Sequence, residues 1–255
     1  MQDDAARDDD AVRDDDARTT TTDGHDADTG SLTGRSALVA GATGGLGRAI
    51  TAGLAARGAT VTAVGRDAER LGGLDAARTA TLDLRAPEAC ASAVEAAIET
   101  GGSLDIVVNA VGVVAFGPVA ELSIDTMEEL FLTNTFVPIM LAKAALPAMA
   151  EGGVIVNLSG VIAERNLPGM AAYGASKAAV RSFDEALARE ARRSKVRVLD
   201  ARPPHTDTGL ADHPLEGEAP RLGDGLDPAE VAGVICDAIA DGSTTDLPGS
   251  AFGQR

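Results

Sequence analysis

Short runs of β-branched and apolar residues alternate with alanine-rich stretches of helical periodicity from position 36 onward. The apolar runs predict strands at 37–40, 60–64, 79–82, 106–109, 154–158 and 196–200. The stretches between them predict helices at 46–57, 67–72, 87–100, 124–149, 170–193 and 228–240. Because the strands have no polar face and are separated by helices, we expect a parallel sheet covered on both sides. The predicted fold class is therefore α/β, a doubly wound parallel sheet in a single domain.

The first thirty residues have a different composition. They contain eleven Asp and three Arg, a charge of 3 − 11 = −8, with almost no large apolar side chain. Such a segment cannot offset its ordering entropy by burial. We therefore expect residues 1–33 to form a disordered acidic tail and residues 34–255 to form the folded domain. A docking tail for a basic partner is the alternative.

The whole chain carries a net charge of −17 and is 45% apolar over 255 residues. This apolar content suffices for one sizeable core. The negative charge argues against nucleic acid and anionic membrane surfaces as partners. Cys90 and Cys236 show no metal-ligand spacing, and no leader or long apolar span is evident. We expect a cytoplasmic protein without a metal site.

A glycine-rich turn, Ala40-Gly41-Ala42-Thr43-Gly44-Gly45-Leu46-Gly47, joins the first predicted strand to the first predicted helix. Its pattern is Gly-x-x-x-Gly-x-Gly, which lets the backbone turn sharply and approach a pyrophosphate at the helix N-terminus. A plain tight connection is the alternative. We expect Gly41, Thr43, Gly45, Leu46 and Gly47 to bind a dinucleotide.

Three polar residues follow later strands. An acid usually binds the ribose 2′-hydroxyl of NAD at the position of Gly65, and none is present there. The next residue, Arg66, could bind a 2′-phosphate, which favours NADP over NAD. The alternative is that Asp67 pairs with the Arg66 guanidinium. Asp83 either accepts from the adenine amino group or caps the helix starting near Pro87. Asn109 lies at the carboxyl edge of the sheet and either contacts the cofactor or ties adjacent strands.

Tyr173, the only tyrosine, stands four residues before Lys177 at the head of an alanine-rich helix. That spacing places both side chains on one helical face. A cation beside a phenol favours phenolate, so the pair is a candidate acid/base couple. A surface tyrosine beside a lysine is the alternative.

From about residue 38 to residue 208 the chain resembles the classical short-chain dehydrogenase/reductase family. The resemblance rests on Gly41/Gly45/Gly47, the Asn-Ala-Val-Gly stretch at 109–112, Asn134, Asn157 and the Tyr173-x-x-x-Lys177 pair. It implies a Rossmann-type sheet, a nicotinamide cofactor and interconversion of an alcohol and a carbonyl. It also implies that Tyr173 donates the proton and that Lys177 binds the nicotinamide ribose and lowers the tyrosine pKa. Asn134 would hold a relay water, and Thr208 would contact the cofactor carboxamide.

The chain departs from the family pattern in four places: Ala40, the pair Ala110/Val111, Pro204 in the usual Pro-Gly turn, and Gly160. Gly160 replaces the serine that binds the substrate oxygen. Either Ser159 swings into the site through a bulge at Gly160, or the donor is absent and the rate falls by about 10²–10³. Ser176 and His205 are further candidates to substitute for it.

We therefore predict an NADP-dependent oxidoreductase, with NAD possible, that acts on a small-molecule carbonyl or alcohol; a weakened dinucleotide-binding sensor or scaffold is the alternative. The stretch 203–227, rich in Gly, Pro and Asp, reads as a flexible lid. Because only 244–252 remain for the last strand that packs between subunits in the family, we expect a homodimer through the two long helices rather than a tetramer.

Overall fold

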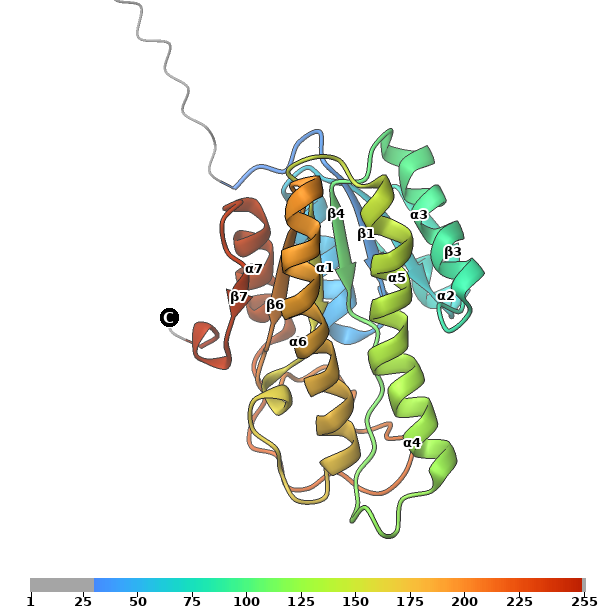
Figure 1. Ribbon diagram of the computed structural model, residues 1–255, viewed down its shortest axis with the longest axis vertical. Helices are drawn as coiled ribbons and strands as arrows, with labels where there is room; N and C mark the ends of the chain where they lie inside the picture. The colour runs from blue at the N-terminus through green and yellow to red at the C-terminus, as the bar shows by residue number, and fades with distance from the viewer. Residues whose placement is uncertain (1–29, 254–255) are drawn as a thin grey trace, which may run out of the picture.

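The computed structural model describes residues 30–253. Its centre is a sheet of seven strands, all parallel, in the order β3-β2-β1-β4-β5-β6-β7 (Figure 1). The strands are β1 (Ser36–Ala40), β2 (Thr60–Gly65), β3 (Arg78–Thr81), β4 (Ile106–Asn109), β5 (Val154–Leu158), β6 (Arg197–Ala201) and β7 (Asp246–Leu247). The predicted doubly wound parallel sheet is confirmed, and the sequence had left the two-residue β7 unassigned.

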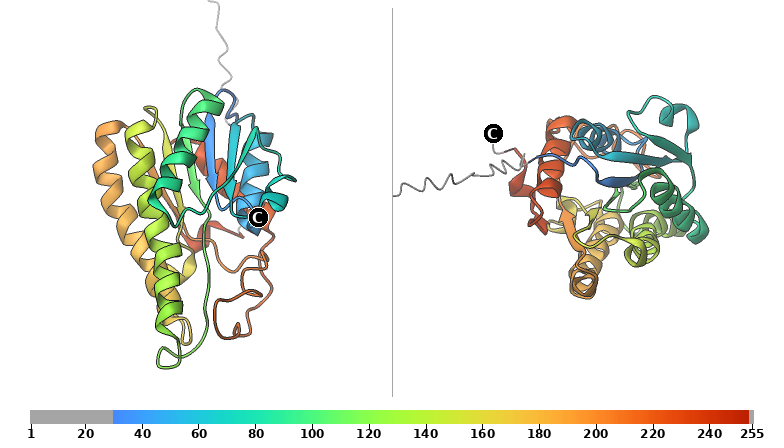
Figure 2. Two further views of the ribbon diagram at one scale, coloured as in Figure 1. Left: turned by 90° about the vertical axis from the view of Figure 1, so that its right-hand side faces the viewer. Right: turned by 90° about the horizontal axis from the view of Figure 1, so that it is seen from above.

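Helices cover both faces of the sheet (Figure 2). The α-helices are α1 (Gly45–Ala56), α2 (Ala68–Leu71), α3 (Pro87–Gly101), α4 (Ile124–Phe131), α5 (Val137–Ala145), α6 (Ala171–Ala191) and α7 (Pro228–Ala240). Short 3₁₀ turns lie at η2 (Leu146–Ala148), η3 (Val161–Ala163), η4 (Arg192–Ser194) and η5 (Gly249–Ala251). Because strand side chains alternate, Val39 packs with α1 and α7 on one face, and Leu38 packs with α3, α5 and α6 on the other.

The predicted helix at 124–149 is interrupted. The π-helical turn η1 (Leu132–Phe136) separates α4 from α5, and Pro138 stands at the start of α5. Because proline has no N–H, the carbonyl of Asn134 loses its ordinary α-helical donor. Within residues 30–253, the combined run Ile124–Ala148 is long and apolar enough to cross a membrane by length and composition, yet half of its apolar window is buried inside the protein. A core helix passes the same test.

The N-terminal boundary of the domain lies earlier than expected. Leu32, which the sequence assigned to the acidic tail, is buried in the core beside α1, and its N–H donates to the carbonyl of Arg57 at 2.7 Å. Its large apolar side chain is unlike the rest of the acidic segment. The tail prediction for residues 1–29 lies outside the described residues.

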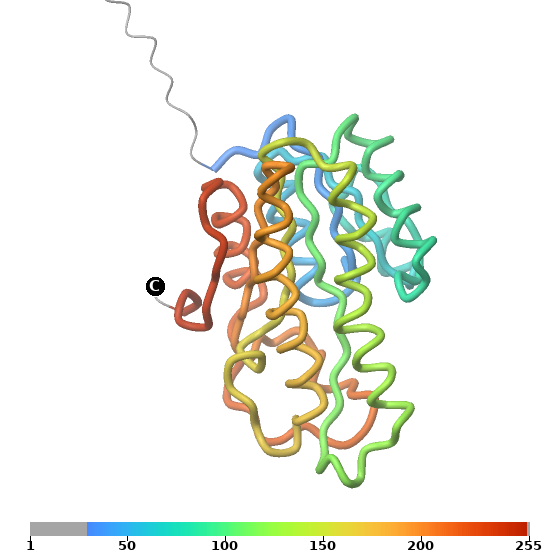
Figure 3. Tube along the Cα trace, viewed as in Figure 1, coloured from blue at the N-terminus to red at the C-terminus, as the bar shows by residue number. Residues whose placement is uncertain are grey.

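The loops that follow the strands gather at the carboxyl edge of the sheet, at the bottom of Figures 1 and 3. The predicted lid, 203–227, is a long loop closed at its base by a bridge between Thr206 and Leu226. Its far end is fastened to the segment after β4, where Phe116 N–H donates to Glu216 and Leu215 N–H donates to Val114. The lid therefore lies across the edge where ligands of such sheets bind.

Candidate active site

The glycine-rich turn has the shape that a pyrophosphate requires. Gly41 has a φ of +77°, and a Cβ there would lie 2.7 Å from the backbone of Ala110; a Cβ at Gly47 would lie 2.2 Å from the carbonyl oxygen of Gly41. Helix α1 begins at Gly45 with neither a side-chain cap nor an acid in its first turn. The N–H groups of its first turn, including that of Leu46, have no acceptor within the helix and can donate to an anion. These residues fit a bound dinucleotide.

The end of β2 supplies the ribose side of this site. A Cβ at Gly65 would lie 2.7 Å from the methyl carbon of Thr43, so an acid at 65 has no room without a shift of that threonine. Arg66 is exposed and makes no ion pair within the described residues. Asp67 instead caps α2, accepting from Arg70 N–H at 3.1 Å. The guanidinium of Arg66 is therefore available to an anionic group.

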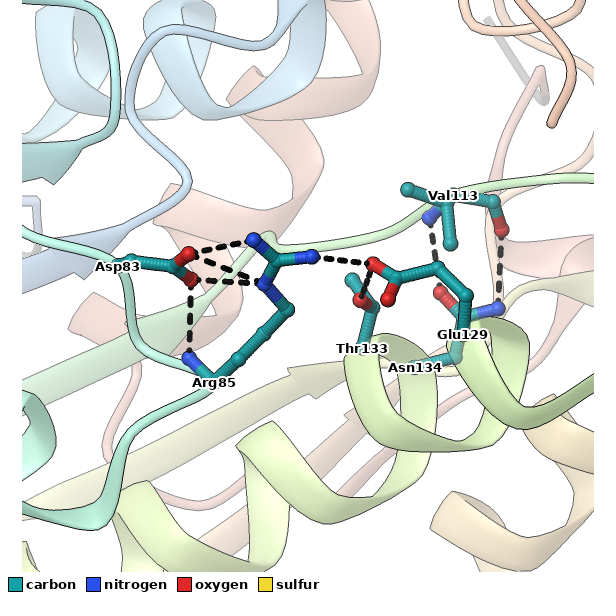
Figure 4. A network of polar contacts seen from close by, with 6 residues as sticks. All are labelled: Asp83, Arg85, Val113, Glu129, Thr133 and Asn134. Carbon is teal, nitrogen blue, oxygen red and sulfur yellow. Dashed lines mark hydrogen bonds and ion pairs between the residues drawn. The ribbon is translucent and has the colours of Figure 1, made fainter. Parts of the chain in front are cut away.

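Asp83 belongs to a polar network rather than to a helix cap (Figure 4). Its carboxylate accepts from Arg85 side-chain nitrogens at 2.6–3.1 Å, and these hydrogen bonds lower the pKa of Asp83. Arg85 also donates to Glu129 at 3.0 Å, which accepts from Thr133 at 2.8 Å. The residue at the N-cap of α3 is Ala86. The capping alternative is therefore wrong, and the adenine contact stays a prediction.

Asn109 ties adjacent strands, as one reading proposed. Its amide donates to the side chain of Asn157 on β5 at 3.3 Å, and its oxygen accepts from Val111 N–H at 3.2 Å. Whether it also contacts a cofactor stays a prediction.

Asn134 lies fully buried in the π-turn η1. Its amide pairs with both backbone groups of Val113, at 2.8 and 2.9 Å, and also donates to the Ser176 hydroxyl at 3.0 Å (Figure 4 shows the Val113 pair). A Cβ at Gly112 would lie 3.5 Å from Asn134 Oδ1 and 3.5 Å from Lys177 Nζ. The fold therefore brings Asn134, Gly112 and Lys177 together.

Tyr173 lies near the start of α6 among apolar side chains, with Val114, Phe116 and Met170 packed around it. Among residues 30–253 its hydroxyl makes no hydrogen bond. Burial raises the pKa of Tyr173 to about 12. Desolvation is the cause of this rise, and the implied effect of Lys177 on the pKa of Tyr173 stays a prediction.

Lys177 is 7% exposed, and its Nζ donates to the carbonyl oxygen of Leu158 at 2.8 Å. Burial lowers the pKa of Lys177 to about 8, and the charge of Asp200 opposes that shift. The ammonium is therefore fixed on the end of β5, one helical turn from Tyr173.

The Ser159 hydroxyl is engaged by a buried carboxylate. The expected bulge is present, because the N–H groups of Ser159 and Gly160 both donate to Ala201, at 3.1 and 3.2 Å, and Gly160 has a φ of +77°. The Ser159 hydroxyl nevertheless is fully buried and donates to Asp200 on β6. Since Asn157 and Ser159 share one side of the strand, the serine follows that side to a buried carboxylate. This geometry favours the alternative in which the usual donor is absent.

The two other proposed substitutes are also occupied. The Ser176 hydroxyl is buried and donates to the carbonyl oxygen of Tyr173 at 2.7 Å. His205 lies at the lid base, with Nε2 at 3.7 Å from Asp207. Neither side chain is directed at the tyrosine hydroxyl by these contacts.

The sequence profile of the short chain dehydrogenases matches residues 35–218, close to three-quarters of the chain. The chain belongs to the short-chain dehydrogenase family. By class it is an NAD(P)-dependent oxidoreductase. Bovine dehydrogenase/reductase SDR family member 7B is 31% identical over 225 residues, which cover 79% of this chain and 69% of that protein.

Solved members of the short-chain dehydrogenase family have the same fold. A Burkholderia cenocepacia short chain dehydrogenase in complex with NADP superposes with a TM-score of 0.76 at 29% identity, covering 86% of this chain and 98% of that one. A dehydrogenase/reductase from Sinorhizobium meliloti gives a TM-score of 0.74 at 28% identity, covering 88% and 97%.

Several residues of this short-chain dehydrogenase site were not predicted from the sequence. The carbonyl of Leu158 and the backbone of Val113 position Lys177 and Asn134, and backbone groups give no sequence signal. Asp184 is buried on α6 and accepts from Asn157 at 2.6 Å. An acid seven residues after Lys177, two turns along the same face, is the signal that would have found it.

Proposed function

We propose that the protein is an NADP-dependent reductase or dehydrogenase that interconverts a small carbonyl compound and its alcohol. The observation that carries the proposal is that Lys177 and Asn134 both lie beside Gly112, with Tyr173 one helical turn before Lys177 near the start of α6. NADP is favoured over NAD by the exposed Arg66 and by the family relative bound to NADP.

The residues that would hold the dinucleotide follow its length. Gly41, Gly45, Leu46 and Gly47 would hold the pyrophosphate, and Thr43 and Arg66 would hold the adenosine ribose. Asp83 would contact the adenine, and Asn109, Lys177 and Thr208 would contact the nicotinamide end. When bound, the nicotinamide ring supplies or accepts the hydride.

Tyr173 handles the proton. The phenol is protonated at neutral pH, so its hydroxyl can donate to the oxygen of a carbonyl substrate, while burial alone makes it a weaker acid than a phenol in water. Lys177 lies one helical turn from Tyr173 with its ammonium held on the Leu158 carbonyl, and Asn134 keeps the loop after β4 in place through Val113. The packing of Val114, Phe116 and Met170 around Tyr173 excludes water and favours an apolar substrate.

Gly160 leaves the substrate oxygen with one donor fewer than the family pattern supplies. We expect the turnover number to be lower by about 10²–10³ than for a site with two donors. Gly160→Ser tests this point directly, since it restores a hydroxyl at the family position. The φ of +77° at Gly160 makes that variant strained, so its melting temperature has to be measured beside its activity.

The decisive experiment is NADPH oxidation with a panel of aldehydes, ketones and quinones, repeated with Tyr173→Phe. We expect NADPH to bind both proteins equally and the variant to lose at least about 10²-fold in turnover. Equal rates in the two proteins, or tight NADPH binding without oxidation by any substrate, would favour the sensor or scaffold alternative instead.

We infer a homodimer through α4, α5 and α6. The side chain of Phe136 is 53% exposed between α4 and α5, which supports an apolar contact there. A stable tetramer in a mass measurement in solution would contradict this inference. A cytoplasmic location is supported by Cys90 and Cys236, which are both free and buried.

A further inference from the structure

The two neighbours of Leu158 are each tied to a buried carboxyl group. Asn157 donates from its amide to Asp184 Oδ1 at 2.6 Å, and Ser159 donates from its hydroxyl to Asp200. Between them, the carbonyl oxygen of Leu158 accepts from Lys177 Nζ at 2.8 Å. The peptide that anchors the lysine is therefore held on both sides.

The two carboxyl groups reach this peptide from different elements. Asp184 lies on α6, seven residues after Lys177, and is 3% exposed. Asp200 lies on β6 and is held by Arg202, a buried arginine that also pairs with Glu164 and, at 2.6 Å, with Asp246. The hydrogen bonds from Asn157 and Ser159 thus join the end of β5 to both the helix above it and the strand beside it.

We infer that Asp184 is a positioning residue for Lys177, acting with Asp200 through Asn157, Ser159 and the carbonyl of Leu158. The inference rests on the proposed function, in which Lys177 belongs to the active site with the proton donor Tyr173. The inference also gives Ser159 a role. It lies one position before the residue that is serine in the family, and its hydroxyl holds the peptide that binds Lys177 instead of binding the substrate.

Asp184 acts in its neutral form. Burial raises its pKa to about 8, the hydrogen bond from Asn157 opposes this shift, and the charge of Asp200 adds to it. Its second oxygen, Oδ2, has no hydrogen-bond partner within the described residues. Asp184 lines a cavity of about 210 Å³. The charged groups that line the same cavity come from α6, from β6 and the residue after it, and from β7: Arg181, Glu185, Asp200, Arg202 and Asp246.

The side-chain amide of Asn157 needs a hydrogen-bond acceptor at position 184, and a neutral one suffices. The amide of Asn157 donates to Asp184, so an asparagine at 184 keeps an acceptor oxygen of the same shape, whereas an alanine removes it. Asp184→Asn and Asp184→Ala therefore separate the hydrogen bond from the charge. Glu185→Gln is the matched control, because Glu185 lines the same cavity but contacts Arg181 at 3.7 Å rather than β5.

The chain has three lysines, Lys143, Lys177 and Lys195, so selective ¹³C labelling of lysine gives three ε-methylene signals for NMR. Lys177→Arg assigns the central signal. In the wild type we expect Lys177 to titrate with a pKa of about 8. Asp184→Ala should move that midpoint toward the ordinary lysine value of about 10.4, while Asp184→Asn and Glu185→Gln leave it in place.

This readout needs no turnover, so it separates the inference from the proposed function. Absence of NADPH oxidation in the wild type sinks the proposed function, whereas an unmoved Lys177 midpoint in Asp184→Ala overturns the inference. In an active enzyme, we expect Asp184→Ala to lower kcat about 10- to 100-fold and Asp184→Asn to retain most of the wild-type kcat. Should Asp184→Ala fail to fold, Ser159→Ala breaks the other side of the anchor, and the same two outcomes decide.

Discussion

Thr208, at the start of the lid, lies directly against Gly45 in the glycine-rich turn: a Cβ at position 45 would lie 2.6 Å from the Cβ of Thr208. The first turn of the fold and the loop after β6 therefore meet over the carboxyl edge of the sheet. Glycine at 45 leaves the space that this contact needs. The proposed pyrophosphate site and the lid are one packed unit.

Gly45→Ala should disrupt this unit. The added methyl group meets Thr208 backbone as well as side chain, so the lid or the turn has to shift. We expect NADPH affinity to fall at least about ten-fold, measured by fluorescence titration. Gly73→Ala is the control, because a Cβ there meets nothing within 4 Å. Unchanged NADPH binding in Gly45→Ala would show that the turn does not hold the dinucleotide.

Arg66→Ala should weaken NADPH and leave NADH alone. The guanidinium is exposed beside Gly65, where a 2′-phosphate of NADPH would lie and where NADH has only a hydroxyl. We expect the dissociation constant for NADPH to rise about 10- to 100-fold, the range for a charged hydrogen bond. Arg70→Ala serves as the control, because Arg70 is also exposed but lies on the following helix α2. Equal losses for NADH and NADPH would refute a role in cofactor choice.

Asp184→Asn should change how stability depends on pH. The pKa of Asp184 rises from 3.8 to about 8 on folding, so the folded protein binds this proton more tightly than the unfolded chain. The proton on Asp184 therefore stabilises the folded protein fully below pH 3.8, and this stabilisation is lost as the pH rises through 8.

Because asparagine does not titrate, the variant should gain at least about 1 kcal/mol in unfolding free energy, relative to wild type, between pH 4 and pH 8. Urea denaturation at both pH values measures the difference. Glu185→Gln, whose native side chain is 66% exposed, should follow the wild type. Parallel curves for wild type and Asp184→Asn would mean that the carboxyl group is ionised in the folded protein.

Glu216→Ala should loosen the lid. The Glu216 carboxylate accepts from the Ser123 hydroxyl at 2.8 Å and from Ser123 N–H at 3.2 Å, at the N-terminus of α4. Hydrogen bonds from Thr126 and then from Ser123 lower the pKa of Glu216. Without them we expect amide hydrogen exchange in residues 205–226 to speed up by at least about three-fold. Glu218 is an exposed neighbour, so Glu218→Ala should leave the exchange rates unchanged. Equal exchange rates of the lid in the two variants would show that Glu216 does not hold the lid to α4.

Most of the fold was predictable because its signals are local. β4 and β5 match their predicted bounds, since short apolar runs bounded by polar residues can be read directly. The interruption of the long helix at η1 was missed although Pro138, inside the predicted helix 124–149, marks it, because the apolar pattern continues unbroken across the proline. Leu32 was missed because its partner, Arg57, lies a full β–α unit away.

The sequence by itself determined the alternation that builds the sheet, the glycine turn and the spacing of Tyr173 and Lys177, because each depends on residues close together in the chain. Only the tertiary structure decided where Ser159 points and what holds Lys177. Those answers depend on which strand and helix lie next to β5, and therefore on Asp200 and Asp184, whose positions no local pattern reveals.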